Sequence, residues 1–212
     1  MDLLSTQAND YLNNLVPPRP AEMQTMEAQA EKDGFPIIGP ACGQVCYQVA
    51  RMLGATKIYE MGSGYGYSTA WFAYAVRQNG GGEVHHVVWD EQLSQQARAH
   101  LGALGYEDIV HYTVGEAVDA ISQAEGPFDI VFCDIDKHAY PEAIEAAYAK
   151  LRMGGALLID NMLWSGRILD EADQSQNTQA IREATGMLVS NDRWITTILP
   201  IRDGLSISYK VK

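Results

Sequence analysis

The sequence has few cysteines and no long apolar run. Its three cysteines, Cys42, Cys46 and Cys133, form no CxxC pair. This small, odd number argues against a cysteine-ligated zinc site and predicts reduced thiols packed inside a cytoplasmic protein. No apolar run approaches the roughly 20 residues that span a bilayer. The start of the chain also lacks the basic residues and apolar core of a secretory signal.

Basic residues are also scarce. The chain has 15 Lys and Arg against 27 Asp and Glu, which gives a formal net charge of −12. A surface this acidic repels the phosphates of nucleic acids and of anionic membranes. We therefore expect no nucleic-acid partner and no membrane partner, whereas a cationic ligand or a divalent metal ion matches the charge.

The composition that remains is typical of a folded domain. Apolar residues make up 47% of the chain and charged residues 20%, which excludes a disordered chain, a collagen-like repeat and a disulfide scaffold. A chain of 212 residues can bury a core of its own. We predict one domain over residues 1–212, with a helical cap over 1–53 and a core over 54–212.

The first part of the chain is predicted to be helical. A helical stretch to about Asp33 is broken between Val16 and Pro20, because proline excludes the residue before it from a helix. A second helix is predicted over 20–32 and a third over 43–53.

After Gly54, strands alternate with helices. Strands are predicted over 57–61, 84–89, 109–114, 128–133 and 156–159, and helices from 68, over 91–104 and from Pro141 to Gly154-Gly155. Two further strands, over 194–199 and 205–211, flank a turn and predict a hairpin. Such alternation implies a parallel sheet with helices on both faces. The predicted fold is α/β: one Rossmann-like, doubly wound, mostly parallel seven-stranded sheet with a C-terminal antiparallel hairpin and extra N-terminal helices.

A glycine-rich turn follows the first predicted strand, in the segment EMGSGYGYS over 60–68. Glycines at a strand end let a ligand approach the backbone, and the N-terminus of the next helix offers free N–H groups. The dinucleotide fingerprint GxGxxG requires glycine where this chain has Tyr67, which argues against a nicotinamide-dependent dehydrogenase. Acidic Glu60 suits a cationic ligand better than a pyrophosphate.

A second polar segment, DIDKHAYP over 134–141, follows an almost wholly apolar strand that is expected to be buried on both faces. Open α/β sheets bind ligands at the carboxyl ends of their strands, where Asp134 and Lys137 are expected. Helix capping is the alternative interpretation, above all for Asp136. His138 is most simply a solvent-facing loop residue.

A third segment, LIDNMLWSG over 158–166, ends the next strand. Asp160 and Asn161 point to opposite faces of a strand and can share a ligand only where the chain turns. Together with Asp134 they form an incomplete shell of oxygen ligands suited to Mg²⁺ or a similar ion. A plain Asp-Asn turn is the alternative interpretation.

These segments resemble the class I S-adenosylmethionine-dependent methyltransferases, specifically the cation-dependent O-methyltransferases of the caffeoyl-CoA and catechol type. Four stretches match in order: 60–68, 134–141, 158–166 and LPIRDGL over 199–205. The resemblance covers roughly residues 20 to 212, and Gly43-Gln44 resembles a further short element of the family.

The resemblance implies a role for each matched residue. Lys137 would be the general base, Trp164 would line the acceptor pocket, and a divalent cation, in the first instance Mg²⁺, would be bound by Asp134, Asp160 and Asn161. The family also implies a homodimer. S-adenosylmethionine would be bound by Glu60, Gly62, Ser63, Gly64, Ser68, Asp90, Glu116, Ala117 and Asp134, with Ala117 against the adenine.

The residues are consistent with this chemistry. Methyl transfer is an in-line displacement from a sulfonium by an oxygen nucleophile, and a phenol with a pKa of about 10 is mostly protonated at neutral pH. A cation stabilises the phenolate, and two adjacent hydroxyls would chelate it, which favours a catechol-like acceptor. A salt bridge to Asp134 or Asp136 is the alternative role for Lys137.

Two positions depart from the family pattern. Val88 stands where the family has an acidic residue that binds the ribose, and Asp90 lies two positions further along the chain. Ala139 stands where the family usually has Asn. These departures leave an alternative open: a non-catalytic or differently specific S-adenosylmethionine-binding protein of the same fold.

Overall fold

The computed structural model describes residues 6–212, and the predicted helix start over residues 1–5 lies outside that part. Seven strands form one sheet in the order β3-β2-β1-β4-β5-β7-β6. All neighbouring pairs are parallel except β5 with β7 and β7 with β6. The predicted fold class, hairpin included, is therefore confirmed. The strands are β1 (Lys57–Met61), β2 (Glu83–Val88), β3 (Val110–Val114), β4 (Phe128–Cys133), β5 (Leu151–Ile159), β6 (Trp194–Leu199) and β7 (Leu205–Lys210).

Eight α-helices and two short 3₁₀ helices connect and cover the strands of the described residues. The prediction missed α6, α8 and both 3₁₀ helices, η1 and η2. The helices are α1 (Thr6–Leu15), α2 (Ala21–Asp33), α3 (Gly39–Met52), α4 (Tyr67–Gln78), α5 (Glu91–Ala103), α6 (Ala117–Gln123), η1 (Lys137–Ala139), α7 (Tyr140–Lys150), η2 (Trp164–Leu169) and α8 (Gln176–Val189).

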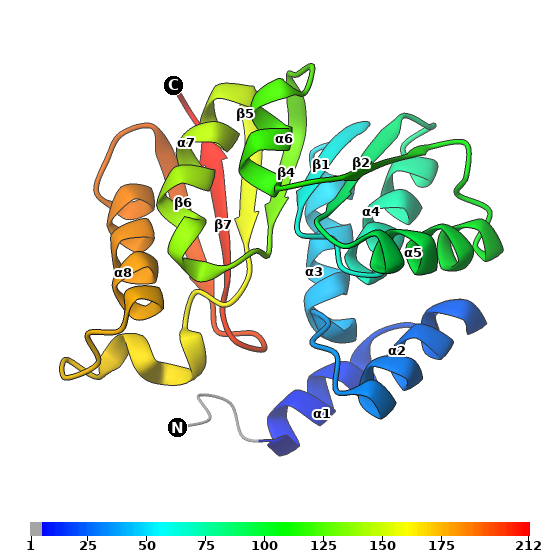
Figure 1. Cartoon of the computed structure of the whole chain (residues 1–212), viewed down its shortest axis with the longest axis horizontal. Helices are drawn as coiled ribbons and strands as arrows, with labels where there is room; N and C mark the ends of the chain where they lie inside the picture. The colour runs from blue at the N-terminus through cyan, green and yellow to red at the C-terminus, as the bar shows by residue number, and fades with distance from the viewer. Residues whose placement is uncertain (1–5) are drawn as a thin grey trace.

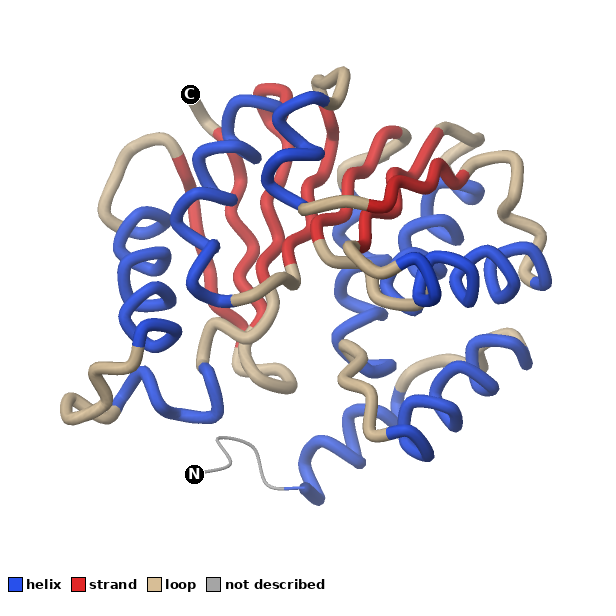
Figure 2. The backbone as a smooth tube through the Cα atoms, in the orientation of Figure 1, coloured by secondary structure: helices blue, strands red, loops and turns tan. Residues whose placement is uncertain are grey.

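Helices cover both faces of the sheet (Figures 1 and 2). Along β4, Ile130 and Phe132 pack with α3, α4 and α5. Their neighbours Val131 and Cys133 pack with α6, α7 and α8 on the other face. Alternate side chains of a strand point to opposite faces, so the expectation that β4 is buried on both faces is confirmed. The three cysteines are also free and buried, as predicted.

The boundary between α7 and β5 corrects the prediction. The helix ends at Lys150 instead of reaching Gly154-Gly155, and β5 begins at Leu151. Leu151 pairs with Phe128, the next register pair is Ala156 with Ile130, and Gly154 between them has a φ of +73°. The glycine therefore belongs to an irregularity within the strand and does not end a helix.

The N-terminal helices lie near the carboxyl ends of the parallel strands. Figure 1 shows α1 and α2 at the end of the molecule where η2 and the β6–β7 turn also lie. By contrast, α3 contributes Cys42, Cys46 and Ala50 to the core beneath the sheet. Within residues 6–212, no helix combines the length and the apolar content needed to cross a bilayer.

Candidate functional site

A cavity of about 620 Å³ opens at the carboxyl ends of β1, β2, β3 and β4. This is the edge at which open α/β sheets bind ligands, and the volume suits a cofactor-sized molecule. Of the residues predicted from sequence, those that line the cavity are Gly62, Ser63, Gly64, Ser68, Glu116, Ala117, Asp134 and Lys137. Those outside its lining are Glu60, Asp90, Asp160, Asn161 and Trp164.

The glycine-rich turn between β1 and α4 forms one wall. Gly62 has a φ of +84°, and a Cβ there would lie 2.1 Å from the backbone oxygen of Asp134. The Ser63 hydroxyl accepts a hydrogen bond of 3.0 Å from the backbone N–H of Val87. These contacts fix the turn against the ends of β4 and β2.

Glu60 lies beneath this turn and is fully buried. Neither of its carboxylate oxygens has a hydrogen-bond partner within the described part of the chain. Burial raises its pKa to about 7, although the nearby hydroxyls of Ser68 and Thr69 act in the opposite direction. Glu60 therefore titrates much closer to neutral pH than an exposed glutamate does.

The predicted ribose residue Asp90 caps α5. Its carboxylate accepts a hydrogen bond of 2.9 Å from the backbone N–H of Leu93. The neighbours Val88 and Trp89 line the cavity, whereas Asp90 does not. Glu116 caps α6 in the same way, by accepting from Val118 and Asp119, but it does line the cavity.

Lys137 lies at the rim of the cavity and pairs with Asp134. The Nζ of Lys137 is 3.0 Å from Asp134 Oδ1 and also donates to the backbone oxygen of Ile135. The ion pair that the alternative interpretation of Lys137 expected is therefore present. Lys137 begins 3₁₀ helix η1, the next element after β4, and it lines the same cavity as the glycine-rich turn.

Asp160, at the end of β5, is buried and pairs with an arginine. Its Oδ2 is 2.5 Å from Nη1 of Arg202, whereas its Oδ1 has no hydrogen-bond partner among residues 6–212. Burial raises the pKa of Asp160 to about 6, and the charge of Arg202 opposes a further rise. Burial acts to lower the pKa of Arg202, but the charges of Asp160 and Asp134 more than reverse this effect. Arg202 is therefore a permanent cation at this position.

Asn161 bonds to the same turn between β6 and β7. Its Nδ2 donates to Asp203 Oδ2 over 3.2 Å, and the backbone N–H of Ser165 donates to Asp203 Oδ1 over 2.5 Å. Asn161 has a φ of +60°, so the chain does turn directly after β5, as a shared ligand would require. Asp134, Asp160 and Asn161 each have a partner from the chain itself: Lys137, Arg202 and Asp203.

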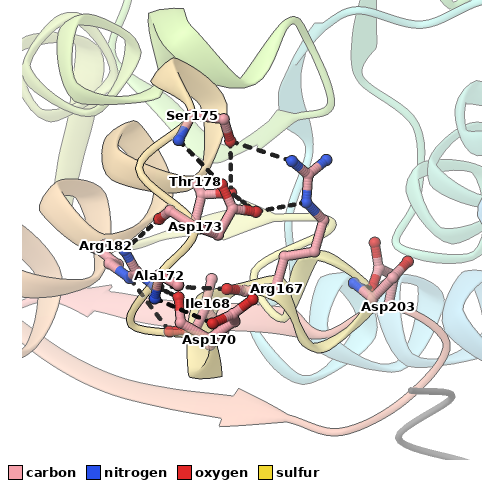
Figure 3. A network of polar contacts seen from close by, with 10 residues as sticks. Arg167, Ile168, Asp170, Ala172, Asp173, Ser175, Thr178, Arg182 and Asp203 are labelled. Atoms are coloured by element: carbon pink, nitrogen blue, oxygen red, sulfur yellow. Dashed lines mark hydrogen bonds and ion pairs between the residues drawn. The ribbon is translucent and has the colours of Figure 1, made fainter.

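Trp164 starts η2, beside the site. Its ring centroid is 5.9 Å from Lys137 Nζ and 5.6 Å from the Arg167 guanidinium carbon. The loop that follows is closed by polar contacts, as Figure 3 shows. Asp173 accepts from Arg167 and Thr178, and Arg182 donates to the backbone oxygens of Ile168, Asp170 and Asp173. The segment that follows Trp164 is thus held in a defined conformation.

Helix α2 is attached to the glycine-rich turn by two tyrosines. The Tyr65 hydroxyl donates to the backbone oxygen of Met26 over 2.9 Å, and the Tyr67 hydroxyl donates to Glu27 over 2.7 Å. Phe35 after α2 lines the cavity and packs on Tyr65, with ring centroids 4.8 Å apart. The N-terminal segment therefore forms part of the cavity wall.

Sequence reasoning assigned no role to Arg202 or Asp203. Both belong to the segment LPIRDGL, which forms the turn of the C-terminal hairpin. Arg202 lies 42 residues from Asp160 along the chain. Nothing in the sequence pattern links this turn to Asp160; the pairing of β7 with β5 brings them together.

Comparison with known proteins agrees with this architecture. The sequence profile of a protein family described as O-methyltransferase matches residues 20–211. A catechol O-methyltransferase from Niastella koreensis is 31% identical over 172 residues, which cover 78% of this chain and 77% of that protein.

Solved structures share the fold. The O-methyltransferase TomG from Streptomyces achromogenes, solved in complex with SAM, has a TM-score of 0.87 at 22% identity and covers 97% of this chain and 96% of its own. An O-methyltransferase from Bacillus cereus, in complex with SAH, has a TM-score of 0.87 at 24% identity, with 97% of both chains covered.

Proposed function

The chain belongs to the O-methyltransferase family, and we propose that it transfers the methyl group of S-adenosylmethionine to a hydroxyl of a small aromatic acceptor. One observation carries the proposal: the glycine-rich turn, Asp134 and Lys137 line a single cavity of about 620 Å³. A methyl donor bound against the glycine-rich turn and the proton acceptor Lys137 would then lie in the same cavity. The TomG and Bacillus cereus structures, solved in complex with SAM and SAH, support the choice of donor.

The residues of the cavity would hold the donor. When bound, S-adenosylmethionine supplies an electrophilic methyl group on a sulfonium. The glycines at 62 and 64 leave the backbone open to the methionine part, and Ser68 lies at the N-terminus of α4. Ala117 offers an apolar contact for the adenine. Binding of the ribose by Asp90 stays a prediction, because the Asp90 carboxylate accepts the hydrogen bond that caps α5.

The neutral amine of Lys137 would receive the proton of the acceptor hydroxyl and become an ammonium group paired with Asp134. The hydroxyl oxygen forms the new bond to carbon, the carbon–sulfur bond breaks, and the sulfur leaves as a neutral thioether. A positioned side chain that takes the proton in such a step accelerates it by about 10² to 10⁴. Alignment of the acceptor oxygen with the methyl group supplies the remaining rate acceleration.

We propose a catechol-like acceptor. The Niastella koreensis relative, a catechol O-methyltransferase, supports this class. Two aromatic rings are also available: that of Trp164, 5.9 Å from Lys137 Nζ, and that of Phe35, which lines the cavity. The homodimer, the cytoplasmic location and the division into a cap over 1–53 and a core over 54–212 stay predictions.

The predicted divalent cation does not fit the side chains as they lie. Asp134, Asp160 and Asn161 are ligands of the right chemistry for Mg²⁺. However, Lys137 and Arg202 already lie within hydrogen-bond distance of the two carboxylates. A divalent ion would have to enter beside two basic side chains, one of which, Arg202, is a permanent cation.

Methyl transfer from labelled S-adenosylmethionine to a panel of catechols, caffeoyl esters and simple phenols tests the proposal. Transfer to at least one acceptor, with saturable donor binding by calorimetry, is the expected result. The alternative of a non-catalytic binding protein rests on Val88 and Ala139 at positions where the family has other residues. It predicts donor binding without transfer to any acceptor. A chain that does not bind the donor would contradict both.

A further inference from the structure

The charges at the end of β5 are already balanced by the chain. Arg202 Nη1 lies 2.5 Å from Asp160 Oδ2, at a carboxylate whose side chain is 0% exposed. Lys137 Nζ lies 3.0 Å from Asp134 Oδ1. Burying a carboxylate without a cation is costly, and removing one partner of a buried pair is strongly destabilising. Arg202 therefore does for Asp160 what a bound cation would do.

The backbone at Arg202 is unusual for an arginine. Its φ is +51°, in the left-handed region that favours glycine and that is strained for other residues. It lies in the turn between β6 and β7, directly before Asp203, which bonds to Asn161 and Ser165. The turn thus holds an arginine in a conformation that directs its side chain to Asp160.

The guanidinium group retains unused donors. Arginine has five N–H donors, and the hydrogen bond to Asp160 is the one recorded for Arg202 among the described residues. Its side chain is 28% exposed, in contrast to Asp160. The remaining N–H groups are available to an oxygen atom of a ligand, and they carry a positive charge that stabilises a developing phenolate.

We propose that the guanidinium of Arg202 takes the place of the divalent cation in this chain, so that the acceptor oxygen is bound and activated without a metal ion. This inference rests on the proposed function and deepens it. The acceptor hydroxyl gives its proton to the neutral amine of Lys137, which becomes an ammonium group beside Asp134. The acceptor oxygen accepts a hydrogen bond from Arg202 and forms the bond to the methyl carbon as the carbon–sulfur bond breaks, so that the sulfur leaves as a neutral thioether. No co-reactant beyond the donor and the acceptor is needed.

Metal binding by the whole chain, measured with Mn²⁺ alone, tests the proposal independently of activity. Free Mn²⁺ is followed by electron paramagnetic resonance, and thermal stability is recorded with and without the ion. We expect no saturable binding by the wild-type chain. Arg202→Gly suits the positive φ and opens Asp160, so it should bind Mn²⁺ saturably, at least about tenfold more tightly than the detection limit that the wild-type chain sets. Arg202→Asn, which also tolerates this backbone region, is a second route to the same result.

Matched variants control for the loss of an arginine and for the identity of the ligand. Arg193→Gly removes an exposed pair with Glu145 and should gain no Mn²⁺ binding. Asp160→Asn added to Arg202→Gly should abolish the gain. Saturable binding of one Mn²⁺ per wild-type chain, or no gain in either variant at position 202, would overturn the proposal.

Activity in a chelator gives a separate result. Once an acceptor is found, methyl transfer by the wild-type chain should persist in EDTA, whereas transfer by Arg202→Gly should fall in EDTA and recover with Mn²⁺. Loss of wild-type transfer in EDTA overturns the proposal. Failure to bind S-adenosylmethionine at all would contradict the proposed function instead. The Mn²⁺ measurement would still show whether Arg202 prevents a divalent cation from binding beside Asp160.

Discussion

Gly62 and Asp134 are in backbone contact where β1 and β4 end. A Cβ on Gly62 would lie 2.1 Å from the carbonyl oxygen of Asp134, and the φ of Gly62 is +84°. Both strand ends belong to the same cavity wall. The position of Asp134, and with it that of Lys137, therefore depends on the absence of a side chain at residue 62.

Gly62→Ala should destabilise the protein and disturb donor binding. Left-handed strain of about 1–2 kcal/mol adds to overpacking of about 1–3 kcal/mol, so we expect a loss of about 3 kcal/mol or more in the free energy of unfolding, measured with urea. Gly105→Ala is the matched control, because Gly105 has a φ of +74° with nothing within 4 Å of its Cβ position. Equal losses in the two variants would show that the contact with Asp134 is unimportant.

Two substitutions distinguish a base from an ion pair at Lys137. Lys137→Met should lower kcat by about 10² to 10⁴. Lys137→Arg keeps the charge beside Asp134 but supplies no group that can accept the proton, since guanidinium does not deprotonate in proteins. If Lys137 is the base, kcat of the Arg variant is as low as that of the Met variant. If Lys137 serves the ion pair alone, the Arg variant keeps most of its activity.

An acidic acceptor provides the control for this prediction. A nitrocatechol is largely ionised before it binds and needs no base. The deficit of Lys137→Met should therefore shrink for this acceptor, whereas donor affinity measured by calorimetry should not change. A deficit of the same size for both acceptors would contradict the proton-accepting role.

The strands could be predicted because apolar, β-branched and aromatic residues are concentrated in them, between glycines and polar turns. The predicted bounds of β1, β4 and β6 match the structure. Of these, β4 is an almost wholly apolar run, whereas β1 and β6 also contain polar residues. Helix α8 was missed because its buried face consists largely of small residues, such as Ala180 and Ala184, in a polar segment. Helix α6 has seven residues, too few for a helical period to be recognised.

The candidate site was only partly predictable. Residues that follow a strand directly, such as Asp134 and Asp160, could be assigned to the correct sheet edge from the strand pattern alone. Arg202 could not, because its contact with Asp160 depends on how β7 pairs with β5. Whether a predicted ligand already has a partner depends on tertiary contacts, and these changed the interpretation of the cation site.

Tyr67→Phe should loosen α2 and weaken donor binding. The hydroxyl donates to Glu27, which also forms a bidentate pair with Arg19. A hydrogen bond to a charged group contributes about 1.5–3 kcal/mol. We expect faster hydrogen exchange over 21–33 and a KM for the donor that is raised several-fold. Tyr47→Phe is the control, since its ring stacks on Tyr74 and its hydroxyl has no recorded hydrogen bond within residues 6–212. Equal exchange rates in the two variants would contradict the role of Tyr67.

Glu60 should make stability depend on pH. Burial raises its pKa from 4.5 to about 7 in the folded protein, so the folded state binds the proton more tightly than the unfolded state does. The resulting stabilisation is fully present below about pH 4.5 and is lost as the pH rises through about 7. Glu60→Gln has nearly the same shape and does not titrate. Between pH 5.5 and pH 8, the free energy of unfolding of wild type should therefore fall by about 2 kcal/mol relative to that of the variant.

The direction of this change separates Glu60 from a carboxylate with the opposite shift. Arg193 lowers the pKa of Glu145, so the stabilisation by Glu145 is lost only as the pH falls below the ordinary range of a glutamate. Glu145→Gln should then differ from wild type by a constant amount over the same interval. Urea unfolding at four pH values measures both differences. A constant difference for Glu60→Gln as well would mean that Glu60 is ionised in the folded protein, and that its two buried oxygens have a partner that the described residues do not supply.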